Sequence, residues 1–111
     1  MTITYDDFDK VDLRAGTIVK AEINVKAKKS AYKIWVDFVE TIGIKQTSAQ
    51  VTYHYTPESL IGKSVIGCLN LGARNIAGFM SEFLLVGFSD PRGNIILATT
   101  DQTVPNGQKL H

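Results

Sequence analysis

Apolar and polar residues alternate along short runs of this chain, and turn-forming residues separate the runs. Over residues 32–38 the sequence YKIWVDF has an apolar residue at every second position and leaves Trp35 among the polar ones. This period of two predicts a strand with one apolar face and one mixed face. Similar runs predict further strands over residues 11–23, 42–50, 63–71, 83–88 and 95–99.

The first of these runs, residues 11–23, contains Gly16. A glycine within a strand pattern is typical of a bulge or a sharp bend. We therefore expect one bent strand that serves both halves of a small barrel. Residues 24–30 hold three lysines and little apolar content, which indicates an exposed connection to the next strand.

Two short helices are predicted by the residues that begin them. Thr4 followed by Asp7 has the spacing of a capping box, which favours a helix over residues 5–10. Thr56 and Pro57 supply the cap and first residue of a helical turn that continues through residue 60 and ends at Gly62.

Together these elements predict an all-β fold, a five-stranded Greek-key barrel of the OB type with short helices and N- and C-terminal extensions. Residues 72–81 are expected to form a loop with a short extended piece around Ile76. A chain of 111 residues with 44% hydrophobic content fits a single domain, residues 1–111, that buries about two thirds of its unfolded surface.

Composition argues against several classes of protein. The one cysteine, Cys68, lies in an apolar run and is expected to be buried, and with only two histidines beside it we expect no metal site and no cofactor. No apolar run approaches the roughly 20 residues that span a bilayer. The N-terminus is acidic where a secretory signal is basic and then apolar, so we expect a soluble, cytoplasmic protein.

The net charge of +1 is unevenly distributed. Residues 1–22 carry a net charge of −2, residues 23–80 carry +4, and residues 81–111 carry −1. A basic middle segment can attract a polyanion by releasing its counterions.

Three ordered motifs carry a resemblance to a known family. Residues 12–16, DLRAG, are similar to the opening motif of the tRNA-binding domain family, and positions within residues 55–63 and 70–82 resemble its second and third motifs in order and spacing. The resemblance covers nearly the whole chain. Residues 42–52, with YKIWVDF before them and NIAGFMSE after them, are most similar to the CsaA branch of that family, small stand-alone homodimers described as protein-export chaperones.

This resemblance implies an OB barrel, a homodimer, and binding of tRNA or other structured RNA without catalysis. The alternative that it also implies is a chaperone that holds unfolded or export-bound polypeptides, possibly on the same surface. One departure concerns the loop around Arg74, where this chain has Ala73 and Asn75 in place of the family's usual proline and second basic residue. The smaller charge lowers the tRNA affinity that we expect.

The candidate RNA-binding residues are polar side chains that can meet a phosphate or a base edge. They are Lys33, Lys45, Gln46, Ser48, Gln50, Arg74, Asn75 and Ser81. On the predicted strand, Gln46, Ser48 and Gln50 share one face and Lys45 points to the other. Plain solvent exposure is the alternative interpretation of this polar strand face.

Other candidate residues have competing interpretations. Ile76, Phe79 and Met80 are the candidates for polypeptide binding, or they cover the barrel. Trp35 is either a stacking platform for a base or a packing residue in the core or a dimer interface.

Two aromatic residues near the N-terminus and one histidine are the remaining candidates. Tyr5 and Phe8 are expected to dock either on the chain's own barrel or on a second subunit. His54 is expected to be a surface or packing residue, because no nucleophile, base and orienting group recur together. We therefore do not expect an enzyme.

Overall fold

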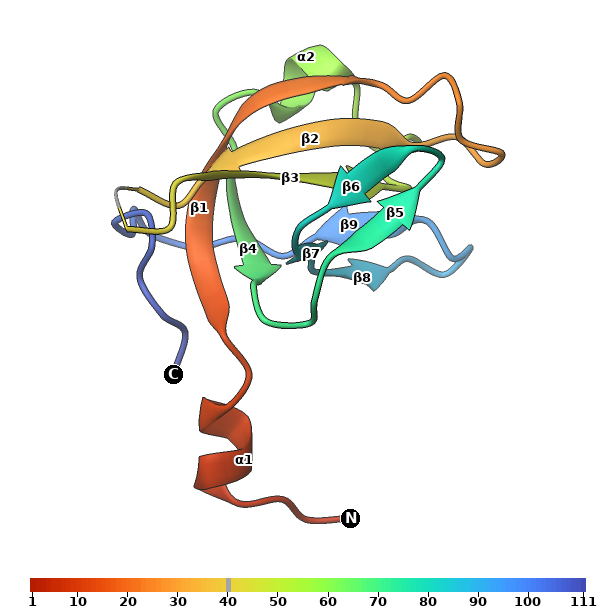
Figure 1. Ribbon diagram of the computed structural model, residues 1–111. Coiled ribbons are helices and arrows are strands. Elements are labelled where there is room, and N and C mark those ends of the chain that lie inside the picture. The colour runs from red at the N-terminus through yellow and green to blue at the C-terminus, as the bar shows by residue number, and fades with distance from the viewer. Residues whose placement is uncertain (40) are drawn as a thin grey trace.

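The molecule is a strongly bent antiparallel sheet with two small hairpins attached to it (Figure 1). This computed structural model describes residues 1–39 and 41–111. The five-stranded sheet has the order β3-β2-β1-β4-β7. The two hairpins are the pair β5 and β6 and the pair β8 and β9. The strands are β1 (Leu13–Ile23), β2 (Tyr32–Asp37), β3 (Ile44–Ala49), β4 (Ser64–Cys68), β5 (Arg74–Ile76), β6 (Phe79–Ser81), β7 (Leu84–Leu85), β8 (Gly87–Ser89) and β9 (Ile95–Leu97). The predicted all-β barrel of the OB type is confirmed.

The barrel interior is filled by the apolar positions of the alternating strands. The largest fully buried side chains are Phe38, Ile18, Ile34, Leu60, Val36 and Val65. Phe38 meets Phe83 edge to face, with ring centroids 5.2 Å apart. The Thr47 hydroxyl on β3 donates a hydrogen bond of 2.7 Å to the Phe83 carbonyl, which links β3 to the segment before β7 and nearly closes the barrel.

Strand β1 serves both halves of the barrel, as predicted. Its first half pairs with β4 and its second half with β2. The register with β2 shifts between Ile18 and Lys20, so the irregularity in the ladder lies at Val19 and not at Gly16, where a bulge or a sharp bend was expected. Gly16 has a different role, because a Cβ atom there would lie 2.5 Å from Cγ1 of Val36.

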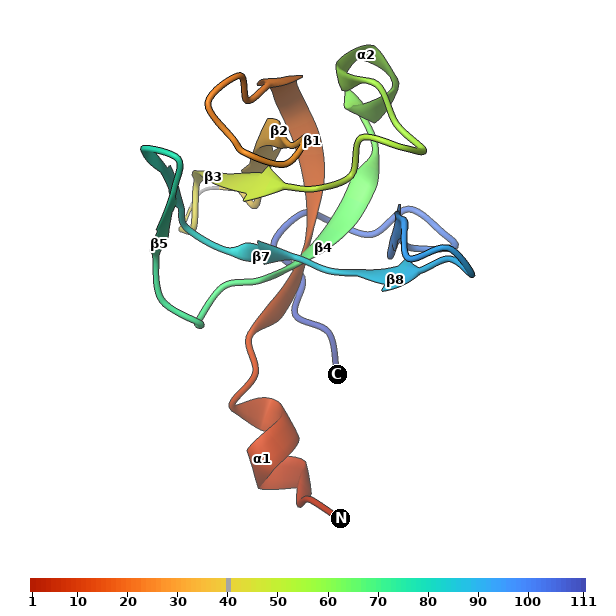
Figure 2. The ribbon, with the colours of Figure 1, turned by 90° about the vertical axis from the view of Figure 1, so that its right-hand side faces the viewer.

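Both helices begin where their capping residues predict. In α2 (Pro57–Leu60) and α1 (Tyr5–Asp9) a threonine hydroxyl accepts from the third main-chain N–H. Helix α2 covers one end of the barrel with the fully buried Leu60. Helix α1 instead projects away from the barrel, which Figures 1 and 2 show from two directions. No residue of α1 is buried and Tyr5 is 90% exposed, so Tyr5 and Phe8 do not dock on the chain's own barrel.

Some element boundaries differ from the prediction. The expected strand over residues 83–88 is divided into two, because β7 pairs with β4 whereas β8, which begins at Gly87, pairs with β9. The expected strand over residues 63–71 ends at Cys68, and the expected loop over residues 72–81 is the β5–β6 hairpin. Along the edge of β1, the C-terminal segment adds main-chain hydrogen bonds, including Leu110 N–H to the Leu13 carbonyl at 2.8 Å. Within the described residues, none of the helices has the length and apolar character needed to cross a membrane.

Candidate nucleic-acid interface

The β5–β6 hairpin is attached to the outer edge of β3 mainly by side chains. The main-chain N–H of Ser48 donates to the Ser81 hydroxyl at 2.8 Å, and that of Gln46 donates to Glu82 Oε1 at 3.1 Å. In return, the Glu82 N–H donates to the Gln46 carbonyl at 2.8 Å. Exposed N–H groups on an edge strand are costly when unpaired, so these bonds both protect the edge and fix the hairpin in place.

The tip of this hairpin presents hydrogen-bond donors. Ala77 and Gly78 both have positive φ, 51° and 80°, as a two-residue hairpin turn of the primed type requires. The Asn75 side-chain oxygen accepts from the Gly78 N–H at 2.9 Å, which leaves the amide nitrogen to meet a partner. Arg74 beside it is exposed and, among the described residues, forms no ion pair. A guanidinium in this position can fork onto a phosphate.

Two aromatic rings and two lysines lie on the outer face of the sheet next to this hairpin. Trp35 on β2 meets Phe79 on β6 edge to face, with centroids 5.6 Å apart. The ammonium of Lys20 lies 4.6 Å from the Trp35 ring centroid, and that of Lys33 lies 5.1 Å from that of Phe79. Since Lys20 already covers a face of Trp35, a base could stack there only after displacing the lysine, and the structure favours the packing interpretation.

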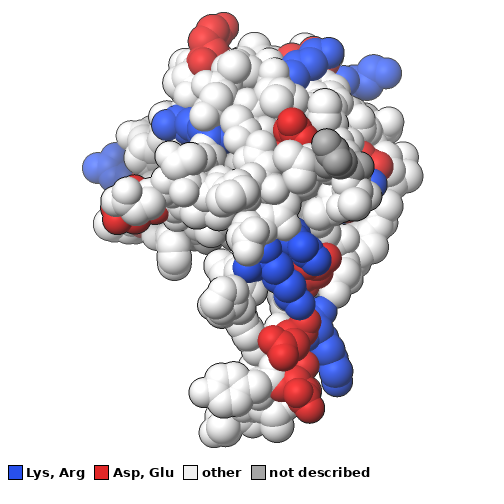
Figure 3. Space-filling view, turned by 90° about the vertical axis from the view of Figure 1, so that its left-hand side faces the viewer, with Lys and Arg blue, Asp and Glu red and all other residues white. Residues whose placement is uncertain are grey.

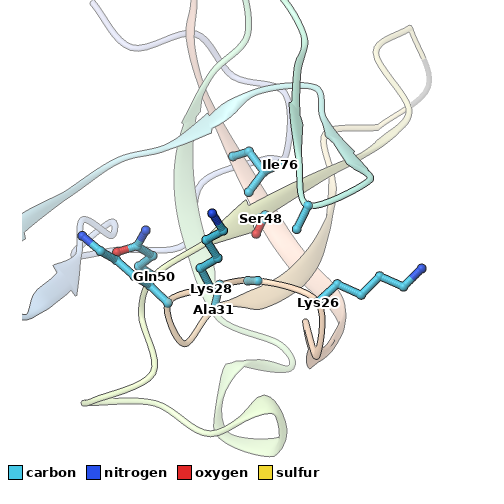
Figure 4. A pocket seen from close by; sticks show the side chains of 9 residues that line it. Lys26, Lys28, Ala31, Ser48, Gln50 and Ile76 are labelled. Carbon is cyan, nitrogen blue, oxygen red and sulfur yellow. The ribbon is translucent and has the colours of Figure 1, made fainter.

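A cavity of about 480 Å³ lies between the connection from β1 to β2 and the tip of the hairpin (Figure 4). It is lined by Lys26, Ala27, Lys28, Lys29, Ala31, Ser48, Gln50, Ile76 and Ala77. In Figure 4 the Lys28 side chain extends toward Ser48, while Lys26 extends to the side. The cavity therefore combines a cationic rim, two polar side chains from the β3 region and an apolar wall.

The lysine-rich connection is held in position by Asn24, which is only 3% exposed. Its side-chain oxygen accepts from the Lys26 N–H at 3.3 Å, and its amide donates to the Ser48 hydroxyl at 3.4 Å. Main-chain bonds to Ala27 and Ala31 complete this turn. Asn24 is not among the residues predicted from the sequence, although an asparagine at the start of a lysine-rich connection is a known turn signal.

A second cavity of about 380 Å³ adjoins the first and shares Ser48 and Ile76 with it. Arg74 stands at this cavity, and Leu71, Phe83 and Leu84 form much of its lining. The two cavities place the lysines of the first and the arginine of the second on either side of Ile76. Positive groups at both cavities can attract the phosphates of one polyanion.

The structure brings most of the predicted RNA-binding residues onto one side of the barrel. Lys33 lies on β2, Gln46 and Ser48 lie on β3, and Gln50 follows the end of β3. Arg74 and Asn75 lie on β5, in the hairpin that packs against β3. Ser81 is different, since it is 6% exposed and its hydroxyl holds the hairpin. Lys45 alternates with Gln46 and so points to the face that carries buried Thr47.

The residues considered for polypeptide binding do not form one surface. Ile76 and Phe79 are cross-strand partners and share a face of the hairpin, whereas Met80 pairs with Asn75 on the other face. The suggested interface residues are also separated. Trp35 lies on β2, while Tyr5 and Phe8 lie on α1, which extends from the opposite side of the barrel (Figure 1).

The opening motif DLRAG has a structural role in this fold. The Arg14 Nε atom donates to Asp12 Oδ1 at 2.6 Å, and Nη1 donates to the Gly107 carbonyl at 3.0 Å. This arginine joins the start of β1 to the C-terminal segment and is not offered to a ligand. In Figure 3 charges of both signs gather where the barrel continues into α1, and the barrel surface above carries only scattered charges.

His54 lies outside this interface and has a partner that the sequence analysis missed. Its Nε2 atom lies 2.8 Å from Asp90 Oδ2, so the segment before α2 is linked to the β8–β9 turn. The hydrogen bond from His54, followed by main-chain bonds from Asn94 and Arg92, lowers the pKa of Asp90 from its ordinary value of 3.8. Two residues 36 positions apart give no local sequence signal for such a pair.

Comparisons with known proteins agree with this geometry. Residues 13–109 match the family model described as "Putative tRNA binding domain". The chain is 34% identical over 109 residues to a methionine–tRNA ligase of Chlorobium phaeovibrioides, covering 98% of this chain and 14% of the ligase. In further methionine–tRNA ligases that it matches, the chain likewise spans only 15–16% of the length.

Two solved structures resemble the whole molecule. The chaperone CsaA of Bacillus anthracis has a TM-score of 0.92 and 36% identity, with 100% of both chains covered. The CsaA chaperone protein of Picrophilus torridus has a TM-score of 0.90 and 39% identity, with 99% of this chain and 100% of that chain covered.

Proposed function

Because this chain belongs to the tRNA-binding domain family, we propose that it binds tRNA or another structured RNA through the outer face formed by β2, β3 and the β5–β6 hairpin. One observation carries the proposal most directly. The exposed Arg74 is held on a hairpin that is fixed to β3, and the lysine-rich cavity lies beside that hairpin. A rigid arrangement of this kind lets positive groups meet phosphates without first being ordered.

The binding chemistry follows from the groups that this face offers. Lysine and arginine meet phosphates, and the Asn75 amide nitrogen donates to an acceptor on a sugar or base. RNA duplexes expose mainly phosphates and 2′-hydroxyls, so contacts of this kind favour shape over sequence. A tRNA-binding domain with CsaA-like neighbours supports a binding module without catalysis of its own, even though the chain also matches a part of methionine–tRNA ligases.

The proposal includes a homodimer in which α1 packs against a second copy. Helix α1 exposes Tyr5, and the preceding Ile3 is 58% exposed. A five-residue helix is too short to be stable without packing, so these side chains need a partner. The symmetry of a homodimer would bring in a second copy of the proposed binding face, which would double the surface available to one RNA.

Polypeptide binding is the second candidate, because both solved structures described above are chaperones. It is less well supported by the surface of this chain. Of the three apolar hairpin residues, only Met80 is exposed, and Phe79 packs on Trp35. RNA binding is therefore the function that we conclude.

The test is a salt titration of tRNA binding by the wild type and the Arg74→Ala variant. Loss of one phosphate contact should weaken binding at low salt and reduce the slope of log K against log salt by about 1. Arg92→Ala is the matched control, because Arg92 is exposed in the β8–β9 turn away from the hairpin. If no saturable binding occurs at low salt, or if the two variants behave alike, this function is refuted.

A further inference from the structure

The cavity between the lysine-rich connection and the hairpin tip has features that a flat RNA-binding face does not need. Its volume of about 480 Å³ lies within the roughly 300–1,000 Å³ of small-molecule sites. Ile76, Ala31 and Ala77 form an apolar wall, and Ser48 and Gln50 supply hydrogen-bonding groups at one side. Such an arrangement suits a planar polar ring more closely than it suits a phosphate alone.

The rim of this cavity is positively charged and is not neutralised from within. Lys26, Lys28 and Lys29 all line it. Among residues 1–39 and 41–111 the ion pairs are those of Lys10, Arg14, Lys20 and His54, so no carboxylate pairs with these three lysines. An anion at the rim would therefore meet a cationic group that has no competing carboxylate partner in the part of the chain that the structure describes.

We propose that this cavity receives one unpaired nucleotide of the bound RNA. The base lies against Ile76, with its edge toward Gln50 and Ser48, and the adjoining phosphate lies at Lys28. A paired base cannot enter, because its edge is occupied and it is held in the stack. The proposal rests on the proposed function and narrows its ligand to structured RNA that carries an unpaired or extruded nucleotide.

The arrangement of the hairpin supports this assignment. Ile76 and Ala77 reach the cavity because the turn at Ala77 and Gly78 is held by Asn75, and the lysine-rich connection opposite is held by Asn24. Both walls are thus fixed before any ligand arrives. The second cavity, with Arg74, lies next along the surface and offers a contact for the following phosphate.

The experiment measures affinity for three RNA hairpins by fluorescence anisotropy. The first has one unpaired nucleotide, the second lacks it, and the third has an abasic sugar at that position. We expect the first to bind at least about tenfold more tightly than the other two. Ala27→Phe, which fills the cavity from its rim, should remove this difference between the three RNAs.

Two further variants guard against misfolding and general surface effects. Gln50→Ala shortens an exposed side chain and should reduce preference for the unpaired base, whereas Gln102→Phe places the same aromatic group on the exposed C-terminal segment and should have no effect. Equal affinity for all three RNAs would overturn the cavity assignment but not RNA binding. Absence of binding to any RNA would refute both the RNA-binding function and the cavity assignment. If an unfolded polypeptide displaced the first RNA from the wild type but not from the Ala27→Phe variant, the cavity would be assigned to polypeptides instead.

Discussion

The hydroxyl of Ser81 accepts a hydrogen bond of 2.8 Å from the main-chain N–H of Ser48, across 33 residues of sequence. Ser81 is 6% exposed, so this contact is shielded from water. It fixes the hairpin that carries Arg74 to the strand that carries the polar row. The position of the candidate interface therefore depends in part on this side-chain acceptor, together with the hydrogen bonds between Gln46 and Glu82.

Substitution Ser81→Ala should lower the free energy of unfolding by about 1–3 kcal/mol, because it leaves the Ser48 N–H without a partner in a shielded place. Urea denaturation at constant pH measures this. Ser89→Ala, on the exposed strand β8, is the matched control and should change stability by no more than about 0.5 kcal/mol. An equal effect of both substitutions would contradict the role given to Ser81.

Substitution Gly16→Ala should lower the free energy of unfolding by about 1–3 kcal/mol or more, since the added methyl group would lie 2.5 Å from Val36 Cγ1. The double variant Gly16→Ala with Val36→Ala should cost less than the sum of the single variants, because the second change removes the nearest colliding atom and leaves only the Phe38 ring carbons at 2.9 Å. Strict additivity in this cycle would show that the two sites do not touch.

Acid should weaken the link between His54 and Asp90. The folded-state pKa of Asp90 lies below 3.8, chiefly because of the hydrogen bond from His54. The stability that the Asp90 carboxylate contributes is therefore present above its unfolded-state pKa and is lost as the pH falls through its folded-state pKa. Asp90→Asn should lower the melting temperature at pH 5, and the gap to wild type should close as pH falls below 3.8. Asp101→Asn, at an exposed position, is the control, and a gap that persists to the lowest pH would count against the link.

Light scattering after size-exclusion chromatography should give twice the 12.2 kDa mass of one chain if α1 packs against a second copy. The double substitution Tyr5→Ser with Phe8→Ser should give monomers with an unchanged circular dichroism spectrum of the barrel, because no residue of α1 is buried. Val25→Ser, at a side chain that is 85% exposed in the lysine-rich connection, is the control. A wild-type protein that is monomeric at all concentrations would exclude the dimer.

The strands and helix caps were predictable because short, continuous stretches of sequence specify them. Alternation over residues 32–38 marks β2, and Thr56 with Pro57 marks α2. The division of β7 from β8 was not predictable, because the apolar run continues across it. The partner strand changes there from β4 to β9, and Gly87 allows the close approach of the Ile96 carbonyl, where a Cβ atom would lie 2.5 Å away.

The candidate site was predictable in its residue types more than in their roles. Gln46 and Ser48 do lie together on one strand face, as period two requires. Ser81 has the same polar character in the sequence, but only the folded chain reveals that its hydroxyl is engaged by Ser48. The burial of Asn24 and the cavity beside it depend in the same way on segments that meet only after folding.

Trp35 is the only tryptophan of the chain, and the ammonium of Lys20 lies over its ring at the margin of the proposed interface. Any anion that draws this lysine away changes the electric field at the indole. The molecule therefore carries its own optical reporter: occupancy of this face can be followed by intrinsic emission without a label, and Lys20→Met supplies the version that has lost the signal.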